Sequence, residues 1–299
     1  MIYVFFRNKK AFCSKIKESY FWKISKKIFC IFFATTDNFN ISCPFFIYLN
    51  GDNMNTLNSF LLTTIAGAST MIGVILIFIN KKNIINKALA FASGVMLTVS
   101  IIDLIPESLT YLNTTFYKVP SFIIMLIFLN VGVIISCLID KYIPTNTDGL
   151  YRVGIISMLA IILHNIPEGI ATFLSSQTNI KLGISLTIAI ALHNIPEGIS
   201  IATPIYYSTK SKKKALWYTF ISGISEPFGA LIAYLFLSKY IGTDINVMGI
   251  ILPIIAGIMT HISLFELLPT SLKYKEKKAT IIFFIIGSVF MIINHLLFG

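Results

Sequence analysis

The sequence predicts an all-α polytopic membrane protein with eight transmembrane helices. Of its 299 residues, 56% are apolar and only 12% are charged, whereas a soluble domain carries about a quarter charged residues. Eight apolar stretches are long enough to span a hydrocarbon core about 30 Å thick, which takes about 20 helical residues. Backbone polar groups in lipid must bond within helices or a closed barrel, and the sequence shows no barrel-like alternation.

Short polar links separate the eight stretches, and none of the links is long enough for a soluble domain. The spans are predicted at 57–79, 84–105, 119–139, 152–175, 181–206, 215–237, 246–270 and 279–298. Residues 51–299 are therefore predicted to form one eight-helix domain. Residues 1–50 form a separate N-terminal extension, and both a targeting segment and a poorly ordered extension fit its basic and apolar composition.

The distribution of Lys and Arg predicts the orientation in the membrane. The links after the first, third, fifth and seventh spans carry thirteen basic residues, whereas those after the second, fourth and sixth spans carry three. Basic loops favour the cytosolic side, so both ends of the eight-helix core are expected to face away from the cytosol. The remaining basic residues lie within 1–27, beyond the distance from a span at which charge has most effect.

Net charge and cysteines exclude several classes of protein. A net charge of +11 could suggest a nucleic-acid binder, but few soluble nucleic-acid binders are this apolar. Basic loops at a lipid surface explain the charge better, so no nucleic-acid partner is expected. The four cysteines show no CxxC spacing, so the sequence predicts neither a disulfide framework nor a thiolate metal site. They are Cys13, Cys30, Cys43 and Cys137.

An internal repeat is the most informative pattern. The heptad HNIPEGI occupies 164–170 and recurs at 193–199, an offset of 29 residues, with each copy inside a predicted span. His164 and Glu168 are four residues apart, and Asn165 and Glu168 are three apart, so all three share one helix face. Pro167 donates no backbone hydrogen bond. The glycine after each glutamate lets backbones approach closely.

Two carboxylates buried in lipid would be costly without a counter-charge. Each costs at least about 2.5–3.5 kcal/mol at the bilayer centre, and a divalent cation would remove both this penalty and the mutual repulsion. If the two helices pack side by side, six N/O ligands meet, and such a set suits Zn(II) or Fe(II) and, less well, Mn(II). The six are His164, Asn165, Glu168, His193, Asn194 and Glu197. The alternative interpretation is a hydrogen-bonded helix-packing motif.

Two further residues are candidate ligands. Glu226 lies between Ser225 and Pro227 in the sixth span, and Met96 in the second span offers a soft thioether. A protonated or paired carboxyl is the alternative for Glu226, and ordinary packing is the alternative for Met96.

Five other polar side chains lie in or near the spans. Asp103 and Glu107 end the second span, where solvation at the interface explains them, and His295 is expected at the interface too. His261 and Glu266 lie in the seventh span, where either a gate or transient ligand or a pair at the helix end is possible.

The doubled heptad resembles the paired HNxPEG motifs of the ZIP (Zrt-, Irt-like protein) divalent-metal transporters, most closely the GufA/ZupT-like branch. Supporting motifs are SEP at 225–227, GVML at 94–97 and ELLP at 266–269, and the resemblance covers about 57–299. It implies a ZIP-type bundle of eight helices, with both ends outside and a binuclear metal centre halfway across the membrane. The resemblance implies that the first metal position would use His164, Glu168, His193 and Glu197, with Met96 nearby. The second position would use Asn165, Glu168, Asn194, Glu197 and Glu226.

The resemblance implies a transporter that moves zinc, and also iron, into the cytosol across the plasma membrane or an organelle membrane. Divalent metal ions and the lipid bilayer are its expected partners, no prosthetic group is expected, and a homodimer is one expectation, since family members are often dimers. The link at 140–151 lacks the His-rich loop of many eukaryotic relatives, and position 194 is Asn rather than a second carboxylate.

Other function classes stay open as alternatives. A metal exporter or a non-transporting sensor would use the same residues. An intramembrane metalloprotease would need HExxH, which the sequence lacks, so no enzyme activity is expected.

Overall fold

The computed structural model describes residues 53–78, 84–142, 149–237, 246–274 and 276–298, and the predicted N-terminal extension lies outside them. The described chain is almost entirely helical and contains no strand, which confirms the predicted class. Its helices are α4 (Asn53–Ser69), η1 (Thr70–Phe78), α5 (Ile84–Val99), η2 (Ser100–Leu104), α6 (Ile105–Asn113), α7 (Lys118–Tyr142), α8 (Gly149–Thr178), α9 (Ile180–Thr209), α10 (Lys212–Ile232), η3 (Ala233–Leu237), α11 (Asn246–His261), η4 (Ile262–Leu267), α12 (Leu268–Leu272) and α13 (Lys277–Phe298).

Eight helical stretches of the described chain are long and apolar enough to cross a membrane, as the sequence predicts. The largest difference is in the second span, which was expected to end at residue 105 and runs from Ile84 to Asn113. The apolar run stops near Pro106, but a proline is tolerated in the first turn of a helical segment. The π-helical segment η2 leads directly into α6, so the helix continues past the polar residues.

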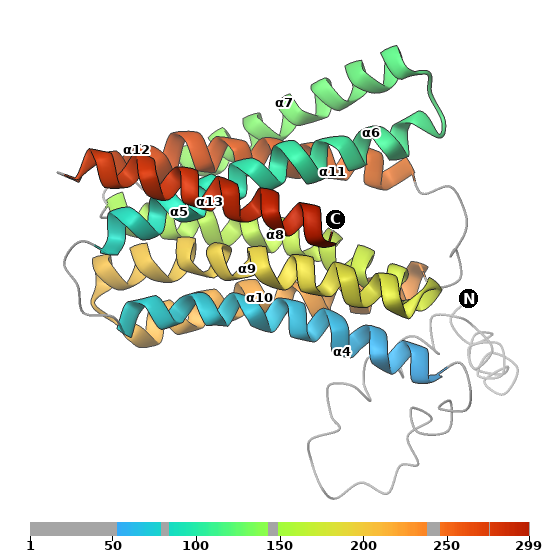
Figure 1. Ribbon diagram of the computed structural model, residues 1–299, viewed down its shortest axis with the longest axis horizontal. Helices are drawn as coiled ribbons and strands as arrows, with labels where there is room; N and C mark the ends of the chain where they lie inside the picture. Colours follow the sequence, from blue (N-terminus) through green and yellow to red (C-terminus); the bar gives the residue numbers. More distant parts are fainter. Residues whose placement is uncertain (1–52, 79–83, 143–148, 238–245, 275, 299) are drawn as a thin grey trace, which may run out of the picture. The chain divides into compact units, whose positions relative to one another are not determined.

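Glycine contacts divide the spans into two groups. The motif group consists of α4 with η1, α8, α9 and α10, and the companion group of α5 with α6, α7, α11 with α12, and α13 (Figure 1). Every close contact of a described glycine lies within one group: for example, Gly67 faces Gly223 in the motif group, and Gly132 faces Ile254 in the companion group. Small residues let helix backbones approach closely in membranes, so each group is tightly interlocked.

Contacts between the two groups include polar ones near the helix ends. On α13, Asn294 Nδ2 donates to the carbonyl oxygen of Ala189 on α9 at 3.0 Å. The hydroxyl of Ser185 donates to the carbonyl oxygen of Phe298 at 3.2 Å. At the other end of the bundle, near the start of α8, Arg152 Nε donates to Asp140 Oδ1 of α7 at 2.8 Å.

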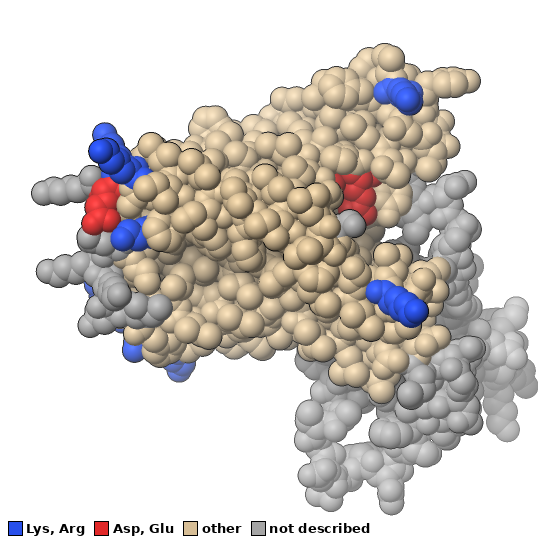
Figure 2. All heavy atoms as spheres, viewed as in Figure 1, with Lys and Arg blue, Asp and Glu red and all other residues tan. Residues whose placement is uncertain are grey.

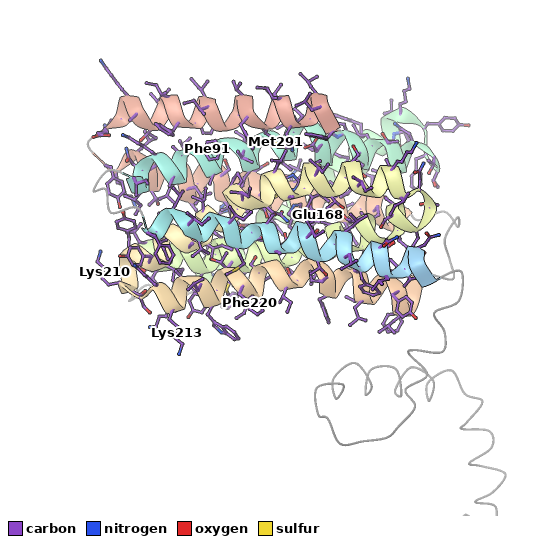
Figure 3. All side chains as sticks on the ribbon, turned by 60° about the horizontal axis from the view of Figure 1, so that its bottom comes forward. Phe91, Glu168, Lys210, Lys213, Phe220 and Met291 are labelled. Atoms are coloured by element: carbon purple, nitrogen blue, oxygen red, sulfur yellow. The ribbon has the colours of Figure 1, made fainter. Side chains whose placement is uncertain are left out.

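The surface has the character of a lipid-facing one. Large apolar side chains such as Phe122 on α7 and Ile282 on α13 are more than half exposed. Figure 2 shows charged side chains toward the ends of the helices, with a broad band of uncharged residues between them. Figure 3 shows Lys210 and Lys213 at one end of the bundle. The protein is therefore an integral membrane protein.

A pair of serines joins α5 to η4 inside the companion group. The hydroxyl of Ser93 donates to the carbonyl oxygen of Ser263 at 3.0 Å, and Ser263 returns the same contact at 2.8 Å. A buried hydrogen bond contributes about 0.5–1.5 kcal/mol, so Ser93→Ala is expected to lower the unfolding free energy by about 1 kcal/mol. Thermal unfolding in detergent measures this, with Thr64→Ala, which loses an exposed hydroxyl, as the control. Equal stability of wild type and Ser93→Ala would contradict the prediction.

Candidate metal centre

The hairpin of α8 and α9 brings the two heptads together. Asn179 alone separates the helices, and its side chain accepts hydrogen bonds from the backbone N–H groups of Lys181 and Leu182 at the start of α9. Gly183 lies against Ser176 near the turn, and Gly154 lies against Ile205 at the far end. The helices are therefore antiparallel, and the two identical heptads run in opposite directions past each other.

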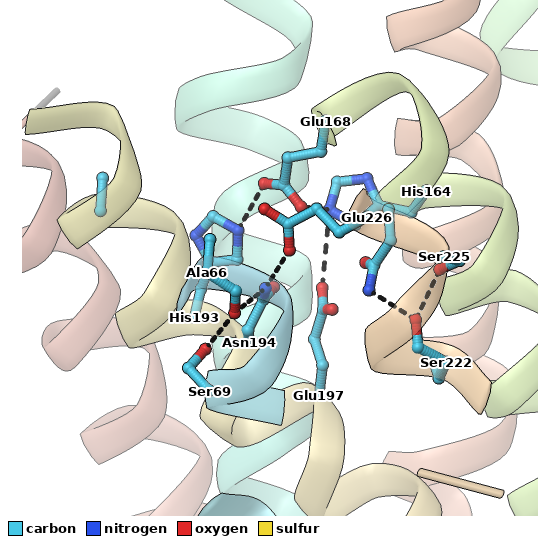
Figure 4. A network of polar contacts seen from close by, with 12 residues as sticks. Ala66, Ser69, His164, Glu168, His193, Asn194, Glu197, Ser222, Ser225 and Glu226 are labelled. Carbon is cyan, nitrogen blue, oxygen red and sulfur yellow. Dashed lines mark hydrogen bonds and ion pairs between the residues drawn. The ribbon is translucent and has the colours of Figure 1, made fainter. Parts of the chain in front are cut away.

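Antiparallel packing pairs each histidine with the glutamate of the other heptad (Figure 4). His193 Nε2 lies 2.7 Å from Glu168 Oε1, and His164 Nε2 lies 3.6 Å from Glu197 Oε1. Within the first heptad, His164 Nε2 also lies 3.4 Å from Glu168 Oε2. Glu168 therefore contacts both histidines, and Figure 3 shows it in the middle of the bundle.

Both asparagines are oriented by neighbouring backbone. Asn165 Nδ2 donates to the carbonyl oxygen of Ser222 on α10 at 3.1 Å, and Asn194 Nδ2 donates to that of Ala66 on α4 at 3.0 Å. A carbonyl oxygen only accepts, so it must face the amide nitrogen. The amide oxygens are therefore left as acceptors, the form in which an asparagine binds a cation.

Glu226 reaches the cluster from α10. It is fully buried, and its Oε2 accepts a hydrogen bond from Asn194 Nδ2 at 2.8 Å. The close approach of α8 and α10 makes this possible, because a Cβ added to Gly169 would lie only 1.9 Å from the carbonyl oxygen of Glu226. Gly198 is equally close to the carbonyl oxygen of Thr70 on η1. Both heptad glycines thus permit the backbone proximity that the sequence predicted.

The cluster contains many buried polar atoms that form no hydrogen bond with the described residues. Nine of them have no hydrogen-bond partner among the residues that the structure describes, and a buried unsatisfied polar atom costs about 1–3 kcal/mol. These atoms are His164 Nδ1 and Nε2, Asn165 Oδ1, Glu168 Oε2, His193 Nδ1, Asn194 Oδ1, Glu197 Oε1 and Oε2, and Glu226 Oε1. Ligand atoms of His164, Glu168 and His193 lie within 4.8 Å of one another, close enough to share one metal ion. The donor set therefore fits a divalent cation.

Met96 is fully buried among apolar side chains of the main core cluster. Its role as a ligand stays a prediction.

Several polar residues outside the heptads have partners that the sequence did not predict. Asp103 and His295, both expected at the interface, contact each other through His295 Nδ1 and the carboxylate of Asp103, which joins α13 to η2. The hydrogen bonds that the structure describes for His261 are with Ser136 and Cys137 of α7, and none of them is with Glu266. Their partners lie more than a hundred residues away in the chain, so local sequence spacing gave no signal for them.

Comparison with known proteins identifies the family. The family model described as ZIP Zinc transporter matches residues 145–295, a region that includes both heptads. A zinc transporter ZupT of Clostridium perfringens is 42% identical over 288 residues, which cover 83% of this chain and 99% of that protein. The chain belongs to the ZIP zinc transporter family.

Other ZIP relatives are similar along most of the chain. The zinc transporter ZupT of Streptococcus mutans is 39% identical over 82% of this chain and 99% of its own length. That of Chlorobaculum parvum is 40% identical over 81% of this chain and 98% of its own length. These matches confirm the resemblance to the ZupT-like branch of the ZIP family that the doubled heptad predicted.

Proposed function

We propose that this ZIP protein transports Zn(II), and also Fe(II), through the cluster formed by the two heptads and Glu226. The observation that carries the proposal is a group of nine buried nitrogen and oxygen atoms that have no hydrogen-bond partner among the described residues. A divalent cation supplies the opposite charge that these atoms need. Imidazole and carboxylate groups bind both zinc and iron, and the names of the ZupT relatives support zinc as a substrate.

The geometry supports a division of the ligands between two neighbouring positions. His164, Glu168, His193 and Glu197 make the mutual contacts of one position. The amide oxygens of Asn165 and Asn194 and the carboxylate of Glu226 would form the other, with Glu168 and Glu197 bridging both. Met96 would be an additional ligand near the first position.

Transport requires that the centre open to each side in turn, and the two helix groups provide the means. All the proposed ligands except Met96 belong to the motif group. The described glycine contacts interlock helices within each group and none crosses between the groups. We therefore infer that the motif group carries the metal as one body while the companion group stays in place, a form of alternating access.

We infer the orientation in the membrane from the charge of the loops and the direction of transport from the ZIP family resemblance. The thirteen basic residues in four alternate links support a cytosolic position for those links. Metal would then enter from the side on which both core ends lie and leave toward the basic links. An exporter would carry metal in the opposite direction, and a sensor would bind metal without net movement.

Uptake of radiolabelled zinc and iron by cells expressing the protein tests the proposal. Wild type is expected to accumulate both metals above cells without the protein, and Glu197→Ala to reduce uptake to that background, because it removes a carboxylate shared by both positions. Glu276→Gln is the control, since this carboxylate is about 40% exposed and pairs with Lys87 outside the centre. Equal uptake by wild type and Glu197→Ala would refute the site, and metal loss from preloaded cells would indicate an exporter.

A further inference from the structure

A thiol and an imidazole meet between α7 and α11, away from the heptads. Cys137 Sγ lies 3.2 Å from His261 Nε2, although the two residues are 124 positions apart in the chain. The cysteine is on the exposed side of α7, and His261 is only 8% exposed. Neither residue contributes to the proposed transport centre.

Two neighbours fix the imidazole in this position. Ser136 Oγ lies 2.9 Å from His261 Nδ1, and the ring of Phe265 stacks on the imidazole at 5.1 Å between centroids and 20° between planes. When the serine oxygen accepts the Nδ1 proton, Nε2 carries its lone pair and faces the sulfur. A histidine oriented through its other ring nitrogen is the usual arrangement at protein metal sites.

The spacing of the two atoms suits a tetrahedral metal ion. With a Zn–S bond of about 2.3 Å and a Zn–N bond of about 2.0–2.1 Å, sulfur and nitrogen lie about 3.5 Å apart. The observed 3.2 Å would need to open by only a few tenths of an ångström. Thiolate and imidazole together favour Zn(II) and softer cations over Mg(II) or Ca(II).

The pair lies near the polar end of α7. Asp140 is three residues after Cys137 on α7, and its carboxylate accepts a hydrogen bond from Arg152 on α8 at 2.8 Å.

The geometry points to a second metal site, in which the Cys137 thiolate and His261 Nε2 bind a zinc-like cation and Ser136 orients the imidazole. Binding releases the thiol proton to solvent as the S–H bond is replaced by a sulfur–metal bond. Sequence spacing predicts no thiolate site here, because the histidine partner of Cys137 lies on another span. This inference stands independently of the transport centre.

Cobalt(II) binding to the purified full chain in detergent tests the site, in a background with Cys13, Cys30 and Cys43 replaced by Ser. We expect a thiolate-to-cobalt charge-transfer band that saturates at one ion per chain. Cys137→Ser should abolish this band, and Ser136→Ala should weaken cobalt affinity about 10–100-fold. Glu168→Gln should retain the band, because the transport centre contains no thiolate. Absence of the band in folded protein, or a band of equal affinity in His261→Gln, would overturn the site.

Alkylation of Cys137 by a maleimide in native membranes gives a second measurement, which needs no substitution at Cys137, His261 or Ser136. The same background is used, in which Cys13, Cys30 and Cys43 are replaced by Ser. Zinc is expected to slow labelling about tenfold or more, because a metal-bound thiolate is not a free nucleophile. Magnesium at the same concentration should give no protection. Equal labelling with and without zinc would overturn the proposal even if the variants at Cys137, Ser136 and His261 fail to fold.

Discussion

Glu168→Gln is expected to lower zinc affinity by at least about 100-fold, since loss of an outer-shell partner alone costs about 10–100-fold. Glu168 contacts both histidines, at 2.7 Å and 3.4 Å. Glutamine has the same shape but only one carbonyl oxygen and no charge, so it cannot bridge two cations. Isothermal titration of the purified protein with zinc measures the loss.

Thermal unfolding separates lost binding from misfolding in Glu168→Gln. Zinc at 100 times its Kd stabilises a folded protein by about 2.7 kcal/mol, so wild type should melt at a higher temperature with zinc than without. Glu168→Gln should still unfold cooperatively without zinc, because glutamine keeps the shape of the side chain and one carbonyl oxygen, and zinc should raise its melting temperature by less than it raises that of wild type. The control Glu276→Gln should respond like wild type. A zinc-dependent rise of wild-type size in Glu168→Gln would contradict the role of this carboxylate.

Gly169→Ala is expected to abolish transport through the backbone rather than through a ligand. The added Cβ would lie 1.9 Å from the carbonyl oxygen of Glu226 and 2.7 Å from its carbonyl carbon, and neither atom can turn away as a flexible side chain would. The helices α8 and α10 must therefore separate, which moves Glu168 and Glu226 apart. Overpacking of this kind typically costs about 1–3 kcal/mol. Zinc uptake and thermal unfolding should both fall.

The same helix provides a matched control for Gly169→Ala. Nothing lies within 4 Å of a Cβ added to Gly149, which begins α8. Gly149→Ala should therefore leave uptake unchanged. If Gly169→Ala transports as well as Gly149→Ala, then close packing of α8 and α10 is not required for the centre.

The sequence predicted the spans well because apolar length is a local property. Apolar runs of about 20 residues identify a membrane helix without knowledge of its neighbours. The facing of His164, Asn165 and Glu168 was likewise predictable from helical spacing. The end of the second span was not, because the helix continues through η2 and Pro106 after its apolar run has ended.

The finer contacts of the centre depend on packing that leaves no trace in the sequence. The orientation of Asn194 is set by the carbonyl oxygen of Ala66, and every residue has such a carbonyl. The pairing of His193 with Glu168 follows from the antiparallel register of α8 and α9, which the heptads alone do not specify. Cys137 and His261 meet only because α7 packs on α11.

The opposed heptads have a consequence for what drives net flux. Because one copy runs inward and the other outward, the centre offers nearly the same donors to an ion arriving from either face, with His193 beside Glu168 and His164 beside Glu197. Such a centre does not by itself set the direction of net metal movement. Net movement must instead be set by the metal's electrochemical gradient and by the surrounding helices that decide which face is open.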